Sequence, residues 1–383
     1  MDQSEPLALY IHWPFCVSKC PYCDFNSHVR AEIDQAAWEQ ALLRDLAHEA
    51  ALLGNRRLGS IFFGGGTPSL MPPATVATLI AAAEAAWGFA PGIEITLEAN
   101  PSSVEAARFA DLGAAGVNRV SLGLQALDDD ALRLLGRAHS VAESLAALDI
   151  AQRAFARVSI DLIYARPGQS ASAWAAELTR AIGFGTEHLS LYQLTIEPGT
   201  RFATDAAAGR LHLPEENTSA ALFELTRAMT GAAGLPAYEV SNHARVGAES
   251  RHNLCYWRYQ DYVGIGPGAH GRRDGMATMR HKKPENWLHA ITRNGHGLVS
   301  EEALSPAMRR DEALLMGLRL REGVDLARIA AIARTAAEPV INPRAATKLM
   351  AEGLVARDGD RLWVTDSGML VLNAIIAALV PDR

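Results

Sequence analysis

The feature that most constrains this chain is an alternation of short β-like runs with Ala/Leu-rich, helix-like stretches over its first half. The β-like runs are Leu7–His12, Ser60–Phe63, Ile93–Glu98, Arg119–Gln125, Arg157–Ile163 and His188–Thr195, and the helix-like stretches between them are Ala36–Leu53, Pro73–Ala86, Val104–Ala115, Asp129–Arg137 with Val141–Ala154, and Ala171–Ile182. Such alternation implies right-handed βαβ crossovers and a parallel sheet. Six units are too few for a closed eight-stranded barrel, so we expect an α/β fold built on an open, partial (β/α)6 barrel.

The unusual residues of the chain fall at the carboxyl ends of these runs, where parallel α/β folds place their ligands. Three cysteines follow the first run, and Gly64-Gly65-Gly66-Thr67-Pro68 follows the second. Glu98 closes the third run, Gln125 ends the fourth and Asp161 lies in the fifth. We therefore expect one site at this edge of the sheet.

The alternation stops after about residue 205, which suggests three parts. Residues 1–205 form the barrel, and residues 206–300 extend it with a helical stretch followed by an aromatic- and His-rich part, Tyr238–Gly271, that holds two or three strands. Residues 301–383 read as helices followed by a hairpin around Asp358-Gly359-Asp360, an order typical of a winged-helix-like module. Basic and acidic residues nearly balance in that module and the whole chain carries a net charge of -7, which argues against a nucleic-acid partner.

Cysteine usage indicates a metal site rather than disulfides. The chain has only four cysteines, and three of them lie within eight residues, which is typical of a reducing compartment such as the cytoplasm. The acidic N-terminus does not resemble a signal peptide. The apolar run Met369–Val380 is too short to cross a bilayer and reads as a core helix, although a loose peripheral contact with a membrane stays open.

The three clustered cysteines have the spacing C-x3-C-x2-C, formed by Cys16, Cys20 and Cys23 on a loop after the first strand. Three thiolates can ligate three irons of a [4Fe-4S] cluster and leave the fourth iron open to a ligand. A structural zinc site with His12 or His28 as fourth ligand is the alternative. The place of the loop at the mouth of a parallel barrel favours the cluster.

The glycine run Gly64–Gly66 allows a tight turn and a close approach of the backbone to a ligand. It lacks the Lys-Ser/Thr ending of a phosphate-binding loop, and a plain βα turn is the alternative. Glu98 and Asp161 sit in otherwise apolar strands, where an unpaired charge is costly, so each needs a partner or a ligand. Gln125 and Arg137 follow the fourth strand, and a structural hydrogen-bond network of these four side chains stays open beside the ligand interpretation.

The cysteine spacing, with the aromatic Tyr22 just before the third cysteine, resembles the signature of the radical S-adenosylmethionine (SAM) superfamily. This resemblance implies a partial (β/α)6 radical SAM barrel, in which the open iron chelates SAM and an electron donor reduces the cluster so that SAM can be cleaved to a radical. It also implies that the SAM contacts come from Tyr10, Tyr22, Gly65, Gly66, Thr67, Glu98, Gln125, Arg137 and Asp161.

A closer resemblance covers almost the whole chain. Tyr10–Cys16, the triple glycine, Ser121–Gln125 and Ser159–Tyr164 resemble the oxygen-independent coproporphyrinogen III oxidase family. Two departures, Phe25 where the oxidase has a fourth cysteine and the short stretch before Cys16, instead resemble the haem chaperone branch (HemW type). That branch implies binding of haem and its delivery to an apo-haem-protein acceptor, for which a respiratory protein is one candidate. The alternative is the oxidase itself, which oxidatively decarboxylates two propionates.

The same branch carries a His-Asn-x-x-Tyr-Trp motif, present here from His252 to Trp257. An imidazole beside aromatic rings suits a haem ligand, and His252 is the residue that we predict for this role. A core strand with one satisfied histidine is the alternative, and Cys255 within the motif reads as a small buried residue. The propionate groups of haem have as candidate partners Arg201, Arg251, Arg272 and Arg273.

Overall fold

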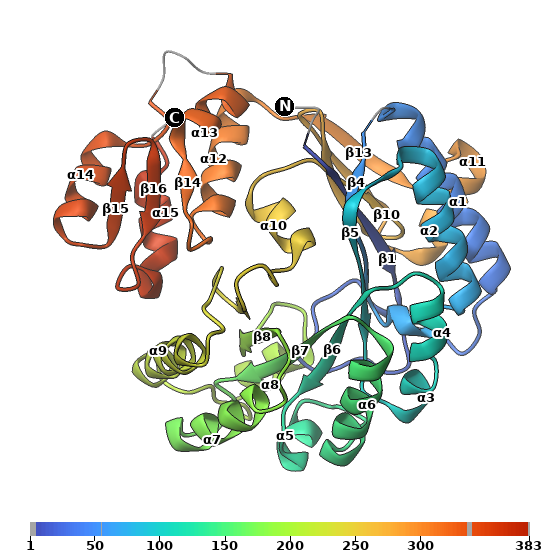
Figure 1. The fold of residues 1–383 in the computed structure, drawn as a ribbon, viewed down its shortest axis with the longest axis horizontal. Coiled ribbons are helices and arrows are strands. Elements are labelled where there is room, and N and C mark those ends of the chain that lie inside the picture. Colours follow the sequence, from blue (N-terminus) through green and yellow to red (C-terminus); the bar gives the residue numbers. More distant parts are fainter. Residues whose placement is uncertain (1–4, 55, 335–338, 382–383) are drawn as a thin grey trace.

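The computed structural model describes residues 5–54, 56–334 and 339–381, and its centre is one 11-stranded sheet (Figure 1). The order of the strands in it is β13-β12-β11-β10-β1-β4-β5-β6-β7-β8-β9. The predicted strands are present as β1 (Leu7–Trp13), β4 (Leu58–Gly65), β5 (Phe89–Ala99), β6 (Arg119–Gln125), β7 (Arg157–Tyr164) and β8 (His188–Gln193). They pair in parallel in sequence order, which confirms the open α/β arrangement.

Helices cover the outer face of the parallel strands (Figure 1). They are α1 (Gln35–Leu52), the 3-10 turn η1 (Pro68–Leu70), α2 (Pro73–Trp87), α3 (Ser103–Ala106), α4 (Phe109–Ala114), α5 (Asp129–Leu134), α6 (Val141–Ala154) and α7 (Ala171–Ile182). Local signals fix several of their starts: Ser140 and Glu143 form a capping box on α6, and the Asp34 and Ser170 side chains cap α1 and α7. The predicted helix Val104–Ala115 is broken into α3 and α4.

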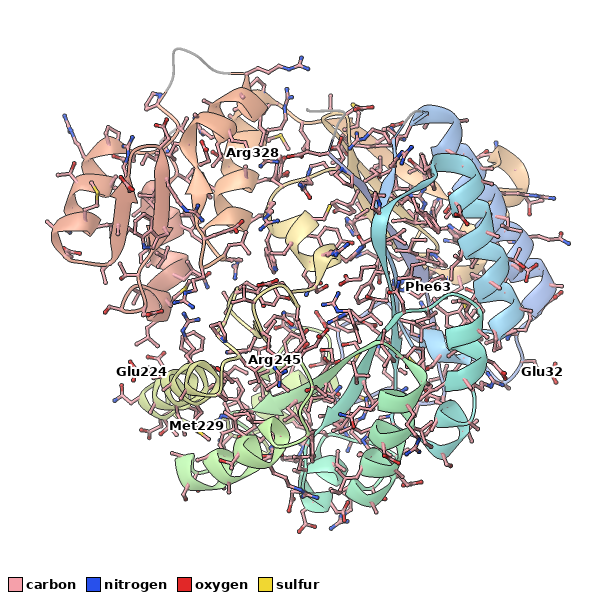
Figure 2. The ribbon with its side chains drawn as sticks, viewed as in Figure 1. Glu32, Phe63, Glu224, Met229, Arg245 and Arg328 are labelled. Carbon is pink, nitrogen blue, oxygen red and sulfur yellow. The ribbon has the colours of Figure 1, made fainter. Side chains whose placement is uncertain are left out.

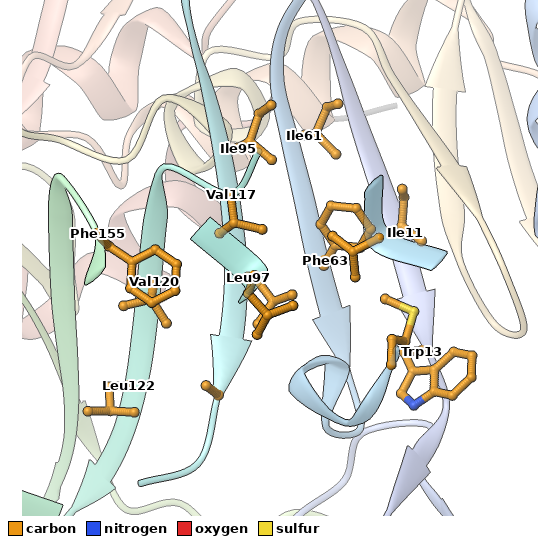
Figure 3. Packing of buried hydrophobic residues seen from close by; sticks show 14 of the residues in the cluster. Ile11, Trp13, Ile61, Phe63, Ile95, Leu97, Val117, Val120, Leu122 and Phe155 are labelled. Atoms are coloured by element: carbon orange, nitrogen blue, oxygen red, sulfur yellow. The ribbon is translucent and has the colours of Figure 1, made fainter. Parts of the chain in front are cut away.

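Strand alternation sorts the side chains onto two faces of the sheet. On the helix-covered face, Ile11, Phe63, Leu97 and Val120 pack in one buried cluster (Figure 3). Each such side chain, when fully buried, stabilises the fold by about 1.5–3 kcal/mol. The neighbouring residues, such as Tyr10, point to the concave face, which the outer helices leave open.

Residues after 200 extend the sheet at both ends. They form α8 (Arg201–Ala207), α9 (Glu216–Ala232), β9 (Asn242–Ala244), α10 (Arg251–Trp257), β10 (Tyr262–Ile265), β11 (His270–Arg273), β12 (Met276–Arg280), α11 (Pro284–Asn294) and β13 (Leu298–Ala303). β10 pairs in parallel with β1 as a seventh parallel strand, whereas β9 and β11 to β13 are antiparallel. The predicted strands of this part are found, but α10 was not predicted. It lies on the concave side, between the strands and the C-terminal helices (Figure 1).

A buried ionic network joins this extension to the barrel. Arg280 on β12 donates to Asp45 at 2.6 Å and to Glu49 at 2.8 Å, and all three side chains are fully buried. Asp45 also accepts hydrogen bonds from the backbone N–H groups of Gly266 and Gly297, each at 3.1 Å. Loss of one partner from such a network costs about 3–5 kcal/mol, so we read it as structural.

The C-terminal module has its own hydrophobic core. It comprises α12 (Pro306–Gly317), β14 (Val324–Asp325), α13 (Leu326–Ala333), α14 (Pro343–Ala351), the hairpin β15 (Val355–Asp358) and β16 (Arg361–Val364), the 3-10 turn η2 (Met369–Val371) and α15 (Leu372–Leu379). The predicted helices and hairpin are present, and α15 packs into this core as expected. Arg328, labelled in Figure 2, ion-pairs with Glu5 at 3.2 Å and links α13 to the start of the chain. The boundaries at 205 and 300 stay predictions, and β13 crosses the second of them.

No helix in the described part of the chain is long and apolar enough to cross a membrane.

Candidate cluster and cofactor site

The concave face near the strand ends is lined by polar side chains that remain partly accessible. Tyr10, Glu98 and Asp161 are half-buried there, whereas their strand neighbours Ile11 and Leu97 are fully buried on the other face. Ionisable groups that stay partly accessible at the carboxyl ends of parallel strands are typical of a ligand site.

The cluster loop begins on the short strand β2 (Phe15–Cys16), which pairs in parallel with β3 (His28–Val29). Cys16, Cys20 and Cys23 are all half-buried, and none forms a disulfide. The N–H of Cys23 donates to the carbonyl of Cys20 at 3.2 Å, which keeps the loop compact. The structure therefore brings the three predicted ligands together on one loop at the mouth of the barrel.

Each of the three sulfur atoms lies near a donor from the surrounding shell. The Thr67 hydroxyl donates to Cys16 Sγ at 3.5 Å, Arg137 Nη1 donates to Cys20 Sγ at 3.4 Å, and Ser27 Oγ lies 4.0 Å from Cys23 Sγ. Burial raises the pKa of Cys16, although the Thr67 hydroxyl works against that rise. Donors of this kind fit cluster thiolates, whose reduction potential depends on hydrogen bonds to sulfur.

The histidines proposed for a zinc site are engaged elsewhere. Both His12 nitrogens are occupied, Nδ1 by the Tyr10 hydroxyl at 2.9 Å and Nε2 by the carbonyl of Asn26 at 2.9 Å. His28 Nε2 pairs with Asn26 Oδ1 at 3.2 Å. Among the described residues, no three His, Cys, Asp or Glu side chains converge as the ligands of one ion do. The partners of His12 and His28 therefore argue against the zinc alternative.

The glycine loop is joined to the cluster strand by its backbone. The N–H groups of Gly66 and Thr67 donate to the carbonyls of Trp13 and Phe15, at 2.7 and 2.8 Å. A Cβ on Gly66 would lie 2.6 Å from the Phe15 carbonyl oxygen, too close to be tolerated. We expected these glycines to admit a ligand. The structure shows another reason for glycine at position 66, because its backbone lies in close contact with the strand that carries Cys16.

Asn100 is a site residue that the sequence reasoning did not assign. Its amide donates to Thr67 Oγ1 at 3.2 Å, and its carbonyl oxygen accepts from Arg137. Arg137 also donates to the carbonyl of Gly123 at 3.3 Å. Asn100 thus connects the donors to Cys16 and Cys20, and its position two residues after Glu98 was the signal that could have revealed it.

Glu98 and Asp161 form an under-neutralised acidic pair. The Glu98 carboxylate accepts from the Gly65 N–H at 3.3 Å, and Asp161 accepts from the Ser121 hydroxyl at 3.0 Å. Desolvation, reinforced by the charge of Asp161, raises the pKa of Glu98 to about 8, and desolvation also raises the pKa of Asp161. In the described chain neither acid ion-pairs with a lysine or arginine. The pair suits a cationic ligand, and SAM carries a sulfonium and an ammonium group.

Gln125 ends β6 with a left-handed backbone, at φ 67°. This conformation costs a non-glycine residue on the order of 1–3 kcal/mol and is frequent at ligand sites. Tyr22 of the cluster loop packs against Phe202 with ring centroids 6.3 Å apart. Glu98, Gln125, Arg137 and Asp161 form no hydrogen bonds with one another in the part of the chain that the structure describes, which weakens the structural-network alternative.

The His252 motif lies on α10 rather than on a strand, and its histidine is satisfied internally. His252 Nδ1 pairs with the Ser60 hydroxyl at 3.0 Å, Nε2 with the Tyr256 hydroxyl at 2.7 Å, and the ring stacks on Phe62. The side chain is 1% exposed, and burial lowers its pKa to about 3. This geometry favours a satisfied core histidine. The haem-ligand assignment stays a prediction that requires the ring to leave one of its partners.

Two arginines suggested for the propionates are committed to the fold. Arg273 pairs with Glu49 at 2.6 Å, and Arg272 lies 3.6 Å from the centre of the Tyr259 ring. Both are buried, so that hypothesis is wrong for these two because neither can reach a ligand. Arg201 and Arg251 remain exposed, and Cys255 is buried as expected.

Comparisons with known proteins bear on this site. The model of the Radical SAM superfamily matches residues 10–179, and that of the HemN C-terminal domain matches residues 304–371. The chain is 38% identical over 390 residues to the Heme chaperone HemW of Escherichia coli (strain K12), with 100% of both chains covered. It is 42% identical over 330 residues to the mitochondrial Radical S-adenosyl methionine domain-containing protein 1 of Bos taurus, covering 84% of this chain and 75% of that protein.

The fold of almost the whole chain matches that of a solved structure. Coproporphyrinogen III oxidase (HemN) from Escherichia coli, described as a radical SAM enzyme, matches with a TM-score of 0.81 and 23% identity, over 99% of this chain and 91% of that one. At this identity the likeness establishes the fold alone. It confirms the expected combination of a radical SAM barrel and a C-terminal helical module.

Proposed function

Because the chain belongs to the radical SAM superfamily, in the family of the haem chaperones HemW, we propose that it is a haem chaperone on a radical SAM scaffold. In this proposal it holds a [4Fe-4S] cluster, binds SAM beside the cluster, and carries haem as cargo to an apo-haem-protein acceptor. The observation that carries the proposal is the full-length similarity to proteins named haem chaperones. The clustered cysteines and their donors support the cluster.

The proposal assigns the cluster to the three clustered cysteines and their hydrogen-bond donors. Cys16, Cys20 and Cys23 ligate three irons, and Thr67 and Arg137 donate to two of the sulfurs. A bound cluster supplies one-electron chemistry and an open iron, and an electron donor is therefore a further partner. Haem stays unmodified as cargo.

The SAM contacts in this proposal come from the concave face and the glycine loop. Glu98 and Asp161 present their carboxylates to the cationic groups of SAM, because in the described part of the chain neither acid ion-pairs with a lysine or arginine. The remaining contacts are assigned to Tyr10, Tyr22, Gly65, Gly66, Thr67, Gln125 and Arg137. Gln125 ends β6 in a left-handed backbone conformation.

Two further expectations belong to the proposal. We expect the protein in the cytoplasm, because its cysteines are free and clustered. We expect no nucleic-acid partner, because the chain is acidic overall. A loose peripheral contact with a membrane stays open.

The competing function is that of a coproporphyrinogen III oxidase. Phe25 separates the two, because it stands where the oxidase family has a fourth cysteine. The deciding experiment supplies reconstituted, reduced protein with SAM and coproporphyrinogen III under anaerobic conditions, next to a Cys20→Ala control. The proposal expects no protoporphyrinogen in either sample. Product above the control would make the protein an oxidase.

A further inference from the structure

The rim of the cluster loop exposes three large apolar side chains. Val17 is 74% exposed, Phe25 58% and Val29 49%. Val17 follows Cys16 directly, Phe25 lies two residues after Cys23, and Val29 is the cross-strand partner of Cys16. Single exposed apolar residues are ordinary, but three on one loop and its paired strand offer apolar surface to a ligand. We call Val17, Phe25 and Val29 the apolar rim.

The Asn26 side chain ties the apolar rim to the sheet extension. Asn26 donates its amide to the carbonyls of Pro267 and Lys282, both at 2.9 Å. Gly268, in a left-handed conformation at φ 77°, leaves room for it, since a Cβ there would lie 2.6 Å from Asn26 Nδ2. The turns before β11 and after β12 therefore lie beside the apolar rim.

His270, the first residue of β11, follows the turn that Asn26 contacts, and its imidazole ring has no hydrogen-bond partner in the described part of the chain. The register that pairs Tyr10 with Gly264 and Tyr262 with Arg272 puts His270 on the concave face, at the mouth of the barrel. Its side chain is exposed, and neither ring nitrogen forms a hydrogen bond with any residue that the structure describes. It thus differs from His252, whose two nitrogens are both occupied. Partial burial and the nearby charge of Lys282 lower the pKa of His270, which favours the neutral, metal-ligating imidazole.

Two lysines bring positive charge to the mouth of the barrel, near the apolar rim and His270. Lys19 lies on the cluster loop itself, and Lys282 follows β12; both are exposed. The charge of Lys282 acts on His270 and that of Lys19 acts on His28, which lies on β3 beside the apolar rim. Exposed apolar side chains, a free imidazole and two ammonium groups therefore lie at the mouth of the barrel.

These are the three features that haem requires: an apolar support for the macrocycle, an axial ligand, and cations for the propionates. We propose that haem docks on the apolar rim at the mouth of the barrel, with His270 as axial ligand and Lys19 and Lys282 toward the propionates. The inference rests on the proposed function and assigns its cargo site. An open site at the rim also suits a carrier that must release its cargo, because haem leaves without unfolding α10.

The test titrates ferric haem into the full, anaerobically reconstituted chain and records the Soret band and the dissociation constant. His270→Ala should lose the spectrum of a histidine ligand and bind haem at least about ten-fold more weakly, which corresponds to about 1.4 kcal/mol. His270→Gln should do the same and guards against a folding defect. Phe25→Ser should weaken binding while the spectrum keeps its form. His289→Ala, an exposed histidine on α11, is the matched control and should match wild type.

The outcomes separate the site from the function. If wild type binds haem and both His270 variants, with normal cluster content, bind it with the same spectrum and affinity, the docking site is refuted and the chaperone proposal stands. If His252→Ala loses the spectrum of a histidine ligand and His270→Ala keeps it, the axial ligand is His252 on α10, and the inference is refuted as well. Absence of haem binding by wild type would overturn both.

Discussion

The replacement Glu98→Gln offers a sharp test of the acidic pair at the strand ends. It keeps the shape of the side chain and an acceptor for the Gly65 N–H, but removes the charge. The folded chain raises the pKa of Glu98 from 4.5 to about 8, chiefly by desolvation and then by the charge of Asp161. The folded state therefore keeps the Glu98 proton where the unfolded chain loses it, so this group lowers stability progressively as the pH rises from about 4.5 to about 8.

The magnitude follows from the size of the pKa change. At 1.36 kcal/mol per pKa unit the cost of ionised Glu98 has an upper limit of about 5 kcal/mol. Water reaches the half-buried side chain and reduces that cost, so we expect about 1–3 kcal/mol. Glu98→Gln should therefore stabilise the SAM-free protein by about 1–3 kcal/mol at pH 8 and hardly at all at pH 5. Urea unfolding at the two pH values measures the difference.

The same replacement that stabilises the SAM-free protein should weaken its binding of SAM. Ionised Glu98 attracts the cationic groups of SAM, so wild-type affinity should rise between pH 6.5 and pH 8.5, and Glu98→Gln should bind weakly with a flat profile. Glu84→Gln, an exposed acid on α2, serves as control and should change neither stability nor affinity. Equal stability of Glu98→Gln and wild type at pH 8, together with unchanged SAM affinity, would refute the reasoning.

Three other predictions concern the cluster and its shell. Cys20→Ala should lose the brown absorbance and most of the roughly four irons expected per chain, whereas Cys255→Ala should keep both; stoichiometric zinc without that absorbance would contradict the cluster assignment. Asn100→Leu should keep the irons but lower the cluster reduction potential in an EPR-monitored titration, because Thr67 and Arg137 lose their common partner; an unchanged potential would show that Asn100 is structural only. Gly66→Ala should lower cluster content as well as SAM affinity, because its Cβ meets the Phe15 carbonyl, whereas Gly231→Ala, in open space, should affect neither; full cluster content in Gly66→Ala would restore the simpler role of admitting the ligand.

Much of the barrel could be predicted because its signals are local. The β-like runs, the caps of α1, α6 and α7, and the Asp-Gly-Asp hairpin signal each act over a few residues, and each element formed near its predicted place. Strand order between distant segments has no such signal. The parallel pairing of β10 with β1 joins residues about 250 positions apart, so the sequence could place strands in the extension but not this one beside the cluster strand.

The sequence points to residue types at the site but not to their contacts. The cysteines, the acids and Arg137 were singled out because charge and sulfur at strand ends need a partner or a ligand, and their ligand roles stay predictions. Asn100 was missed because an amide after a strand is unremarkable until its partners are known. Arg272 and Arg273 were misjudged as ligand-binding because a sequence does not show that Tyr259 and Glu49 already hold them. For the same reason the sequence could not decide between a haem ligand and a satisfied core histidine at His252, whose partners are Ser60 and Tyr256.

The central claim, that this protein carries haem for another protein, is tested most directly by transfer. Anaerobically reconstituted protein loaded with one equivalent of haem is mixed with an apo-haem-protein, and the Soret spectrum of the acceptor is followed over time. The account predicts that the acceptor acquires haem from the loaded protein. It also predicts that the Cys20→Ala variant, which lacks the cluster beside the apolar rim, transfers less. A loaded protein that retains its haem in the presence of excess acceptor, or that never binds haem, would contradict it.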